Sequence, residues 1–211
     1  MKYDIISLEK SRSNTDMDNI IFEILNSNNG YITSKEITNK GIHRMYLKKL
    51  CDAGIIEKVG TGIYIDKSII PDYYFILSLE LPNIVYSHMA ALYFHNLFIK
   101  APNDSFDITV PNNYYNYKLK NHHVFYCDKE TYKMGITYVQ TPMGHLVKTY
   151  DIERCICDII KSKNRMDFEL VKYSIKAYLK RKDKDLTKLF KYASKLRVEK
   201  EVANCLEFFY E

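Results

Sequence analysis

The chain has 211 residues, of which 46% are hydrophobic, and a formal net charge of +5 at neutral pH. This length and hydrophobic content suit one large or two small globular domains with packed cores. No stretch approaches the roughly 18 uninterrupted apolar residues that a membrane span requires. Residues 1–10 also lack the apolar run of a secretory signal. We therefore expect a cytoplasmic protein without a membrane partner.

The first predicted helix follows a polar, aperiodic and loose start at residues 1–14. Thr15 is placed to cap this helix, and the acidic residues that follow suit the positive end of its dipole. An apolar face predicts burial of Ile20, Ile21, Ile24 and Leu25. A turn at residues 26–30 and a short extended link at residues 31–33 come next.

A helix-turn-helix pattern occupies the following stretch. Thr33 and Glu36 have the spacing of a capping box, which predicts the start of a short helix. Gly41 suits the left-handed residue that ends this helix and opens a brief turn. A second helix is predicted over residues 43–53, and Gly54 ends it.

A hairpin is predicted directly after this helix pair. Two short runs rich in β-branched residues, 55–59 and 63–66, are joined by Gly-Thr-Gly at residues 60–62. This composition is typical of two strands with a tight tip. A helix-turn-helix followed by such a wing predicts a winged helix-turn-helix DNA-binding domain, which we assign to residues 1–67.

A second domain is predicted over residues 68–211. The junction at residues 68–72 contains a proline, which restricts the residue before it, and an aspartate that can cap the next helix. Helices are predicted at residues 73–80 and 88–98, the second capped by Ser87. Their apolar positions indicate packing against the rest of this domain.

The pattern then changes from strands to helices. Period-two runs predict strands at residues 106–110, 123–127, 136–141 and 146–150, with a short helical segment at residues 129–134. From residue 151 onward glycine and proline are absent, and aspartate caps predict helices at residues 151–161, 167–182 and from 185. A last helix is predicted at residues 199–210. We predict an α+β fold, in which the winged helix-turn-helix precedes a larger domain with a small, mostly antiparallel sheet and a C-terminal helical bundle.

The positive charge is unevenly distributed. Residues 1–66 are neutral, with nine basic and nine acidic residues, but residues 34–62 hold six basic and three acidic residues. A larger surplus lies at residues 161–200, with fourteen basic and five acidic residues. These basic regions favour a polyanionic partner, and both ends of the chain are candidates for contact with phosphate.

The winged helix-turn-helix pattern predicts which side chains face DNA. The second helix of such a motif presents its N-terminal residues to base edges, and basic wing residues contact phosphates. The candidate groove-facing residues are His43, Arg44, Met45, Tyr46, Lys48 and Lys49. The candidate phosphate contacts are Ser34 and Lys35 at a helix N-terminus, and Lys58 and Thr61 in the wing. Winged helices also serve as protein-binding modules, which is the alternative interpretation.

The sequence gives little support for metal binding, cofactor binding or catalysis. The histidines are not clustered as zinc ligands, and the five cysteines form no CxxC pair. GxSxG, GxxxxGK[ST] and GxGxxG motifs are all missing, so we expect no cofactor, no metal and no enzymatic activity. Charged residues interrupt the apolar helix at residues 153–158. A structural ion-pair network is favoured over a functional site there.

Four segments of the chain match one known protein family. The first is GYITSKEITNKGIHRMYLKKLCDAGIIEKVGTGIYI, beginning at Gly30. The others are VYSHMAALYFHNL at residues 85–97, DITVPNNYYN at residues 107–116 and GITYVQTPMGHLVKTYDIERCICDII at residues 135–160. Together these segments resemble the AbiEi family of antitoxins. The resemblance covers roughly residues 15–205, and the last segment is the most specific.

The resemblance implies a role in a bacterial type IV toxin–antitoxin system that causes abortive phage infection. In such a system the N-terminal winged helix binds inverted repeats in the promoter and represses its own operon. The C-terminal domain, here residues 68–211, acts as the antitoxin domain and counters an AbiEii-like toxin that resembles nucleotidyltransferases. This activity does not require a stable complex with the toxin. The alternative is a protein-binding module that neutralises the toxin by direct complex formation, with the winged helix as an interaction surface.

Overall fold

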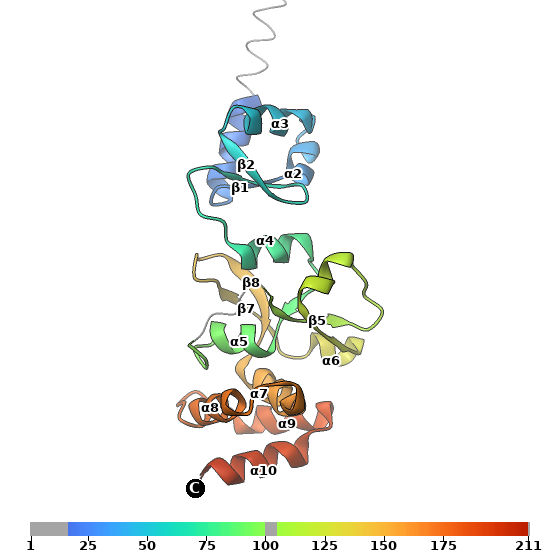
Figure 1. Cartoon of the computed structure of the whole chain (residues 1–211), viewed down its shortest axis with the longest axis vertical. Coiled ribbons are helices and arrows are strands. Elements are labelled where there is room, and N and C mark those ends of the chain that lie inside the picture. The colour runs from blue at the N-terminus through green and yellow to red at the C-terminus, as the bar shows by residue number, and fades with distance from the viewer. Residues whose placement is uncertain (1–16, 100–104, 211) are drawn as a thin grey trace, which may run out of the picture. The chain divides into compact units, whose positions relative to one another are not determined.

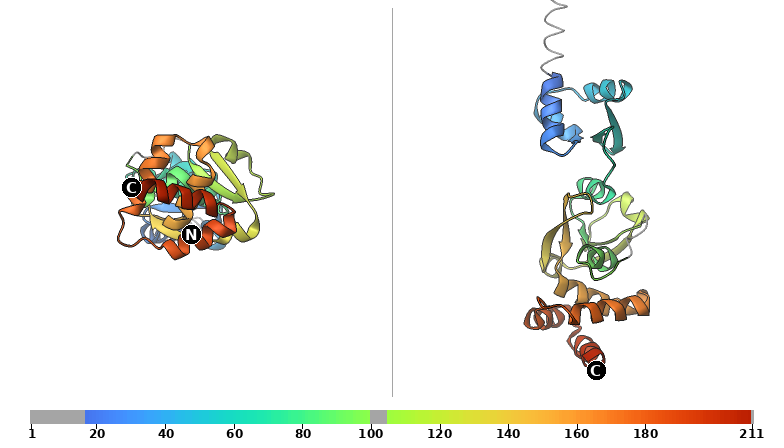
Figure 2. Two further views of the ribbon diagram at one scale, coloured as in Figure 1. Left: turned by 90° about the horizontal axis from the view of Figure 1, so that it is seen from below. Right: turned by 90° about the vertical axis from the view of Figure 1, so that its left-hand side faces the viewer.

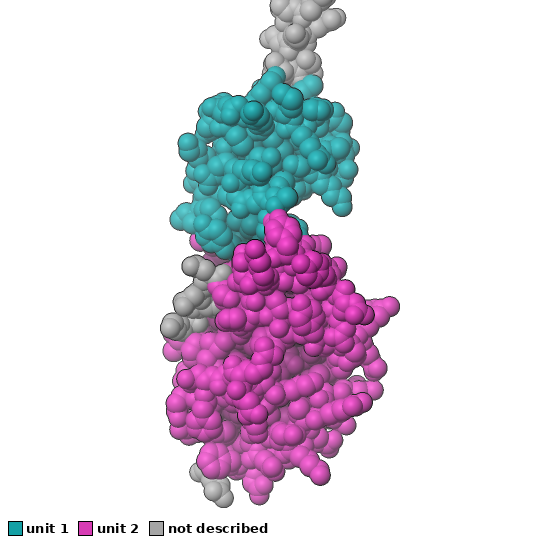
Figure 3. Space-filling view, turned by 45° about the vertical axis from the view of Figure 1, so that its right-hand side comes forward, with its two compact units in different colours: residues 1–80 teal, residues 81–211 magenta. Residues whose placement is uncertain are grey.

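The computed structural model describes residues 17–99 and 105–210 (Figure 1). The chain divides into two compact units, Met1–Glu80 (unit 1) and Leu81–Glu211 (unit 2), which Figure 3 shows in separate colours. The predicted loose start and its Thr15 cap lie outside the described residues. No helix within the described ranges is long and apolar enough to cross a membrane.

Unit 1 begins with three helices. Residues 17–27 are helical, and they are followed by α2 (Ser34–Asn39) and α3 (Met45–Asp52). The predicted capping box is confirmed, because the Glu36 amide donates to Thr33 Oγ1 over 3.2 Å and the Thr33 amide donates to Glu36 Oε2 over 2.7 Å. Gly41 has φ +76° after α2 and Gly54 has φ +70° after α3. Glycine adopts this left-handed backbone without a steric penalty, so the two glycines set the helix ends.

A three-stranded antiparallel sheet completes this part of unit 1. Its strands are β1 (Tyr31–Thr33), β2 (Ile56–Gly60) and β3 (Ile63–Asp66), in the order β1-β3-β2. The predicted hairpin is present, with a register shift between Lys58 and Gly60. The segment predicted as an extended link is β1, which pairs with β3 along its whole length. The core between helices and sheet is formed by Ile21, Ile24, Leu25, Ile32, Ile37, Ile42, Leu47, Leu50 and Ile56.

Helix α4 (Tyr73–Glu80) also belongs to unit 1. Its predicted cap is confirmed, because Asp72 Oδ1 accepts the amides of Tyr74 and Phe75 at 3.1 and 3.2 Å. The Phe75 ring packs edge-on against Tyr31, with ring centroids 5.0 Å apart. The compact unit therefore extends to residue 80, whereas the predicted boundary lies between residues 67 and 68, before α4.

Unit 2 is built on a five-stranded sheet. The strands are β4 (Val85–Tyr86), β5 (Asp107–Pro111), β6 (His123–Cys127), β7 (Ile136–Gln140) and β8 (Leu146–Tyr150), in the order β6-β5-β4-β8-β7. The prediction of a mostly antiparallel sheet is wrong. Pairs β4–β5 and β7–β8 are antiparallel, but β4–β8 and β5–β6 are parallel, so the sheet is mixed. The missed central strand β4 has only two residues, too few to show a period-two pattern.

The helices of unit 2 lie mostly after the sheet in the chain. They are α5 (His88–Phe94), η1 (Tyr117–Asn121), α6 (Lys129–Lys133), α7 (Ile152–Lys161), η2 (Lys163–Arg165), α8 (Phe168–Leu179), α9 (Leu186–Leu196) and α10 (Glu199–Tyr210). Figures 1 and 2 place α8, α9 and α10 together at one end of this unit. The predicted caps of α7, α8 and α9 are confirmed, because Asp151, Asp167 and Asp185 each accept a first-turn amide.

The start of α5 differs from its prediction. Ser87 occupies the cap position, but its side chain does not accept a helix amide. The Asp107 carboxylate, from β5, accepts the Met89 amide at 2.9 Å instead. The helix also ends four residues early, at Phe94, because Asn96 has φ +56°. A distant carboxylate thus replaces the local cap.

Helix α7 is the central helix of the unit 2 core. It contacts α5, α8, α9 and α10, and residues 153–160 are all buried. Arg154 Nε donates to Asp158 Oδ1 over 2.9 Å, and its Nη1 donates to the carbonyls of Thr131 and Met134. The guanidinium also lies over the Tyr150 ring, 4.2 Å from the centroid. The charged run at residues 153–158 therefore contains a buried ion pair that joins α7 to the segment carrying α6.

Candidate nucleic-acid interface

One face of α3 is exposed and basic. Leu47 and Leu50 are buried in the unit 1 core, which directs the opposite side of the helix to solvent. Met45, Lys48 and Lys49 lie on that side at the i, i+3, i+4 spacing, and Met45 is 61% exposed. These predicted groove-facing side chains therefore share one surface.

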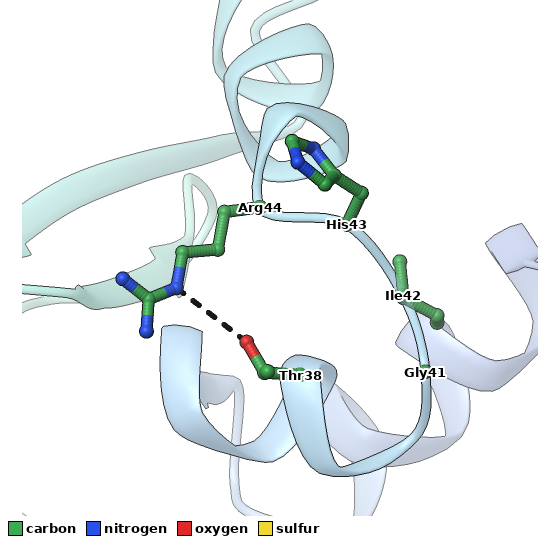
Figure 4. Close-up of a pocket in the computed structure, with 5 residues that line it drawn as sticks. All are labelled: Thr38, Gly41, Ile42, His43 and Arg44. Atoms are coloured by element: carbon green, nitrogen blue, oxygen red, sulfur yellow. Dashed lines mark hydrogen bonds between the residues drawn. The ribbon is translucent and has the colours of Figure 1, made fainter.

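The turn before α3 adds two further candidates, shown in Figure 4. Arg44 is exposed, and its Nε lies 3.5 Å from the hydroxyl of Thr38 in α2. The His43 Nδ1 accepts the Met45 amide at 3.2 Å, so this ring covers the start of α3. A hollow of about 380 Å³ lies between the helices, lined by Thr38, Gly41, Ile42, His43 and Arg44. Thr38 was not among the predicted contacts. Its exposed position in the last turn of α2 makes it a further candidate.

The N-terminus of α2 has fewer free amides for a phosphate than predicted. The Ser34 amide donates to the Gly62 carbonyl over 2.8 Å, and the Glu36 amide donates to Thr33 Oγ1. These two amides are therefore already bonded within unit 1. The Lys35 amide, the Ser34 hydroxyl and the exposed Lys35 ammonium remain as candidate contacts at this end.

The wing carries both a cation and an unexpected carboxylate. Lys58 is exposed on β2, and Thr61 is exposed at the hairpin tip, as predicted contacts should be. The Thr61 amide, however, donates to Glu80 Oε1 of α4 over 2.7 Å. A phosphate at this amide would have to displace a carboxylate of the same charge. The sequence did not indicate this pairing, because Glu80 lies nineteen residues away in the chain.

Tyr46 is used inside unit 1 rather than on the exposed face. Its hydroxyl donates to Asp18 Oδ1 over 2.7 Å and so links α3 to the first helix. Burial and the neighbouring Asp18 carboxylate raise the pKa of Tyr46 to about 12. The Lys49 ammonium lies 5.7 Å from the centroid of this ring. The Tyr46 hydroxyl is therefore already bonded within unit 1, whereas the sequence pattern predicts that Tyr46 faces a groove.

Replacing Tyr46 with phenylalanine is expected to destabilise unit 1 by about 1 kcal/mol, because a hydrogen bond to a partly buried carboxylate is lost. Urea denaturation at pH 7 measures this loss. At a temperature where both proteins are folded, the affinity for duplex DNA should stay within about twofold of the wild type. A folded Tyr46→Phe protein with strongly weakened DNA binding would show that the hydroxyl contacts the nucleic acid.

The histidines are dispersed over different structural roles. His95 contacts the Tyr150 carbonyl at 2.7 Å, and His123 contacts the Asp107 carboxylate at 2.9 Å. Within residues 17–99 and 105–210, no group of three or more His, Cys, Asp or Glu side chains is arranged to hold a metal ion.

The fold defines a mixed α+β protein whose N-terminal unit presents a basic helix beside a β-hairpin. Residues 19–65, which span this helix and most of the hairpin, match the family described as "Transcriptional regulator, AbiEi antitoxin". Over these residues the chain is therefore similar to the transcriptional regulators of the AbiEi antitoxin family. The match confirms the resemblance for this segment.

The wider fold is also found in a solved structure. The crystal structure of the RV2827C protein from Mycobacterium tuberculosis matches with a TM-score of 0.63 and 11% sequence identity. The match covers 89% of this chain and 75% of that chain. At this identity the likeness shows a shared fold alone. No curated protein matches the chain.

Proposed function

We propose that the protein is an autoregulatory antitoxin, in which unit 1 acts as a winged helix-turn-helix that binds inverted repeats in its own promoter. Unit 2 counters a toxin resembling nucleotidyltransferases. The observation that carries this proposal is the match of residues 19–65 to the AbiEi regulator family. The exposed basic face of α3 in the same segment supports it.

The proposed DNA contacts follow from the geometry of unit 1. In this proposal Arg44 and Met45, at the start of α3, contact base edges in the major groove. Lys48 and Lys49 extend the same face toward the phosphates, and Lys58 supplies a phosphate contact from the wing. Phosphate contacts position the domain, whereas the base contacts select the operator sequence.

The antitoxin activity of unit 2 rests on the resemblance of its three segments to the AbiEi family. In this proposal the antitoxin domain extends from the end of α4 to the C-terminus, and the toxin is countered without a required stable complex. The basic surplus at residues 161–200 lies within this unit.

An electrophoretic mobility shift with the full-length protein tests the DNA-binding part. The probes are the DNA upstream of its own gene and a scrambled duplex of equal length, at two salt concentrations. We expect selective binding to the promoter, with an affinity that falls as salt rises because counterions are released from the phosphates. A folded protein without selective binding at low salt would refute the autorepressor.

Replacing Arg44 with alanine is expected to weaken operator binding at least fivefold, in line with about 1–3 kcal/mol for a base-reading arginine.

Replacing Lys49 with alanine should weaken binding to operator and to scrambled DNA alike. It should also lower the slope of log affinity against log salt by about one, as loss of one phosphate contact does. Both variants should protect cells from the toxin as well as the wild type does.

The matched control is Lys67→Ala. This exposed lysine follows β3, and its ammonium approaches Gly54, beyond the C-terminal end of α3. Its removal should leave the operator affinity nearly unchanged. Normal operator binding by both Arg44→Ala and Lys49→Ala would place the reading surface elsewhere on unit 1.

A protein-binding role for unit 1 is the second candidate function. Two observations favour it, the 61% exposed Met45 on the α3 face and the Glu80 carboxylate bound at the wing tip. Co-purification of the tagged protein with the neighbouring toxin tests this alternative. A stable complex that Met45→Lys abolishes, together with no DNA binding, would favour it.

A further inference from the structure

A cleft in unit 2 brings together charged and aromatic side chains that the proposed function does not use. It has a volume of about 380 Å³, within the range of small-molecule sites. The side chains that matter are His88, Phe125, Arg154, Asp158, Lys161 and Arg165. They come from α5, β6, α7 and η2, so tertiary folding alone assembles this cleft.

The inner part of the cleft is polar and buried. His88 is 3% exposed, and its ring nitrogens contact the hydroxyls of Ser87 and Ser162, each at 3.0 Å. Asp158 bonds to Arg154 through Oδ1, but its Oδ2 has no hydrogen-bond partner within the described part of the chain. Buried polar atoms are normally paired, so this oxygen is an acceptor available to a ligand hydroxyl or amino group.

The backbone of His88 is also unusual. It has φ +45°, in the left-handed region that residues with a Cβ seldom adopt. Such a conformation persists only where the surroundings hold it, and it is concentrated at functional sites. The ring stacks on Phe125 with centroids 3.4 Å apart, which fixes it against the wall of the cleft.

The rim of the cleft is cationic and partly aromatic. Lys161 and Arg165 are exposed, and neither forms an ion pair with any residue that the structure describes. The Arg165 guanidinium lies 4.9 Å from the centroid of the Phe125 ring. With Arg154, the cleft has three cations and a single carboxylate, which favours an anion.

We propose that this cleft binds a nucleoside phosphate. Lys161 and Arg165 hold the phosphate at the rim, where a guanidinium and an ammonium suit its oxygens. The cleft is larger than a phosphate needs, so it has room for the nucleoside attached to that phosphate. The free Asp158 oxygen accepts a hydrogen bond from a sugar hydroxyl or a base amino group. This site is separate from the proposed DNA contacts, which all lie in unit 1.

Isothermal titration calorimetry of the full-length protein tests the proposal. The ligands are AMP, GMP, CMP and UMP. Inorganic phosphate and adenosine, the two halves of AMP, are titrated separately. We expect saturable one-site binding of at least one nucleotide, at least tenfold tighter than either half. A 5′-phosphorylated single-stranded tetranucleotide, titrated in parallel, distinguishes a free nucleotide from the end of a nucleic acid strand.

Two double variants decide whether binding occurs in this cleft. Lys161→Ala with Arg165→Ala should weaken nucleotide binding at least tenfold and leave the fold intact, because both side chains are exposed. The charge-matched control, Lys182→Ala with Lys191→Ala, removes two exposed lysines outside the cleft and should change affinity less than twofold. Equal weakening by both double variants, phosphate binding as tight as the nucleotides, or no saturable binding of any nucleotide would each overturn the proposal.

Discussion

Replacing Arg154 with alanine is expected to destabilise unit 2 by about 3–5 kcal/mol, the cost of breaking a buried ion pair from one side. Arg154 is 2% exposed and Asp158 5% exposed. Burial raises the pKa of the Asp158 carboxyl, and the Arg154 guanidinium opposes that rise. Without Arg154, the carboxylate loses its partner, and the carbonyls of Thr131 and Met134 lose a donor.

Urea denaturation followed by circular dichroism at pH 7 measures this effect. The double variant Arg154→Met with Asp158→Leu should recover much of the lost stability, since no charge is then left buried. The control is Lys195→Ala, whose ion pair with Glu130 is solvent-exposed at both ends and should contribute little. An Arg154→Ala protein as stable as this control would show that the pair is not structural.

Lowering the pH from 6.5 to 5 is expected to remove about 2 kcal/mol of stability from unit 2 through His88 alone. Burial, reinforced by the Arg154 and Arg165 cations, lowers the pKa of His88 to about 3 in the folded protein. The unfolded chain takes up this proton near pH 6.5, whereas the folded protein does not. The stabilisation is therefore fully present above pH 6.5 and is lost progressively as the pH falls toward 3.

The measurement compares denaturation at pH 7 and pH 5 for the wild type and His88→Asn. Asparagine is neutral at both values and tolerates the positive φ of this position. The variant should lose less stability than the wild type between the two pH values. His95, whose pKa burial also lowers, remains in both proteins and cancels in the difference. Identical pH dependence in His88→Asn and the wild type would show that His88 takes up its proton in the folded state.

Local sequence signals determined most element positions in this chain. Thr33, Asp151, Asp167 and Asp185 each cap the predicted helix, because a side-chain oxygen placed before a helix satisfies its free amides wherever the helix packs. Gly41 and Gly54 end their helices for an equally local reason, their positive φ. Leu47 and Leu50, three residues apart, form the buried side of α3, and helical periodicity then fixes which side chains point away from the core.

The sequence was less informative where an interaction joins distant segments. Tyr46 has the sequence position of a groove-facing residue, yet its hydroxyl bonds to Asp18, 28 residues earlier. Glu80 reaches the amide of Thr61 at the wing tip, and this contact helps to place α4 in unit 1. A side chain can satisfy a distant polar group without any local pattern, so only the fold shows which partner it takes.

The helices and longer strands, most of their caps and their buried faces could therefore be predicted from local sequence patterns. The fold as a whole set the mixed sheet, whose central strand Val85–Tyr86 is too short to be periodic and is held by neighbours on both sides. It also decided the cleft of unit 2, which assembles His88, Phe125, Asp158 and Arg165 from different elements. Caps and periodicity depend on residues a few positions apart, whereas strand order and clefts depend on which surfaces the whole chain can bury together.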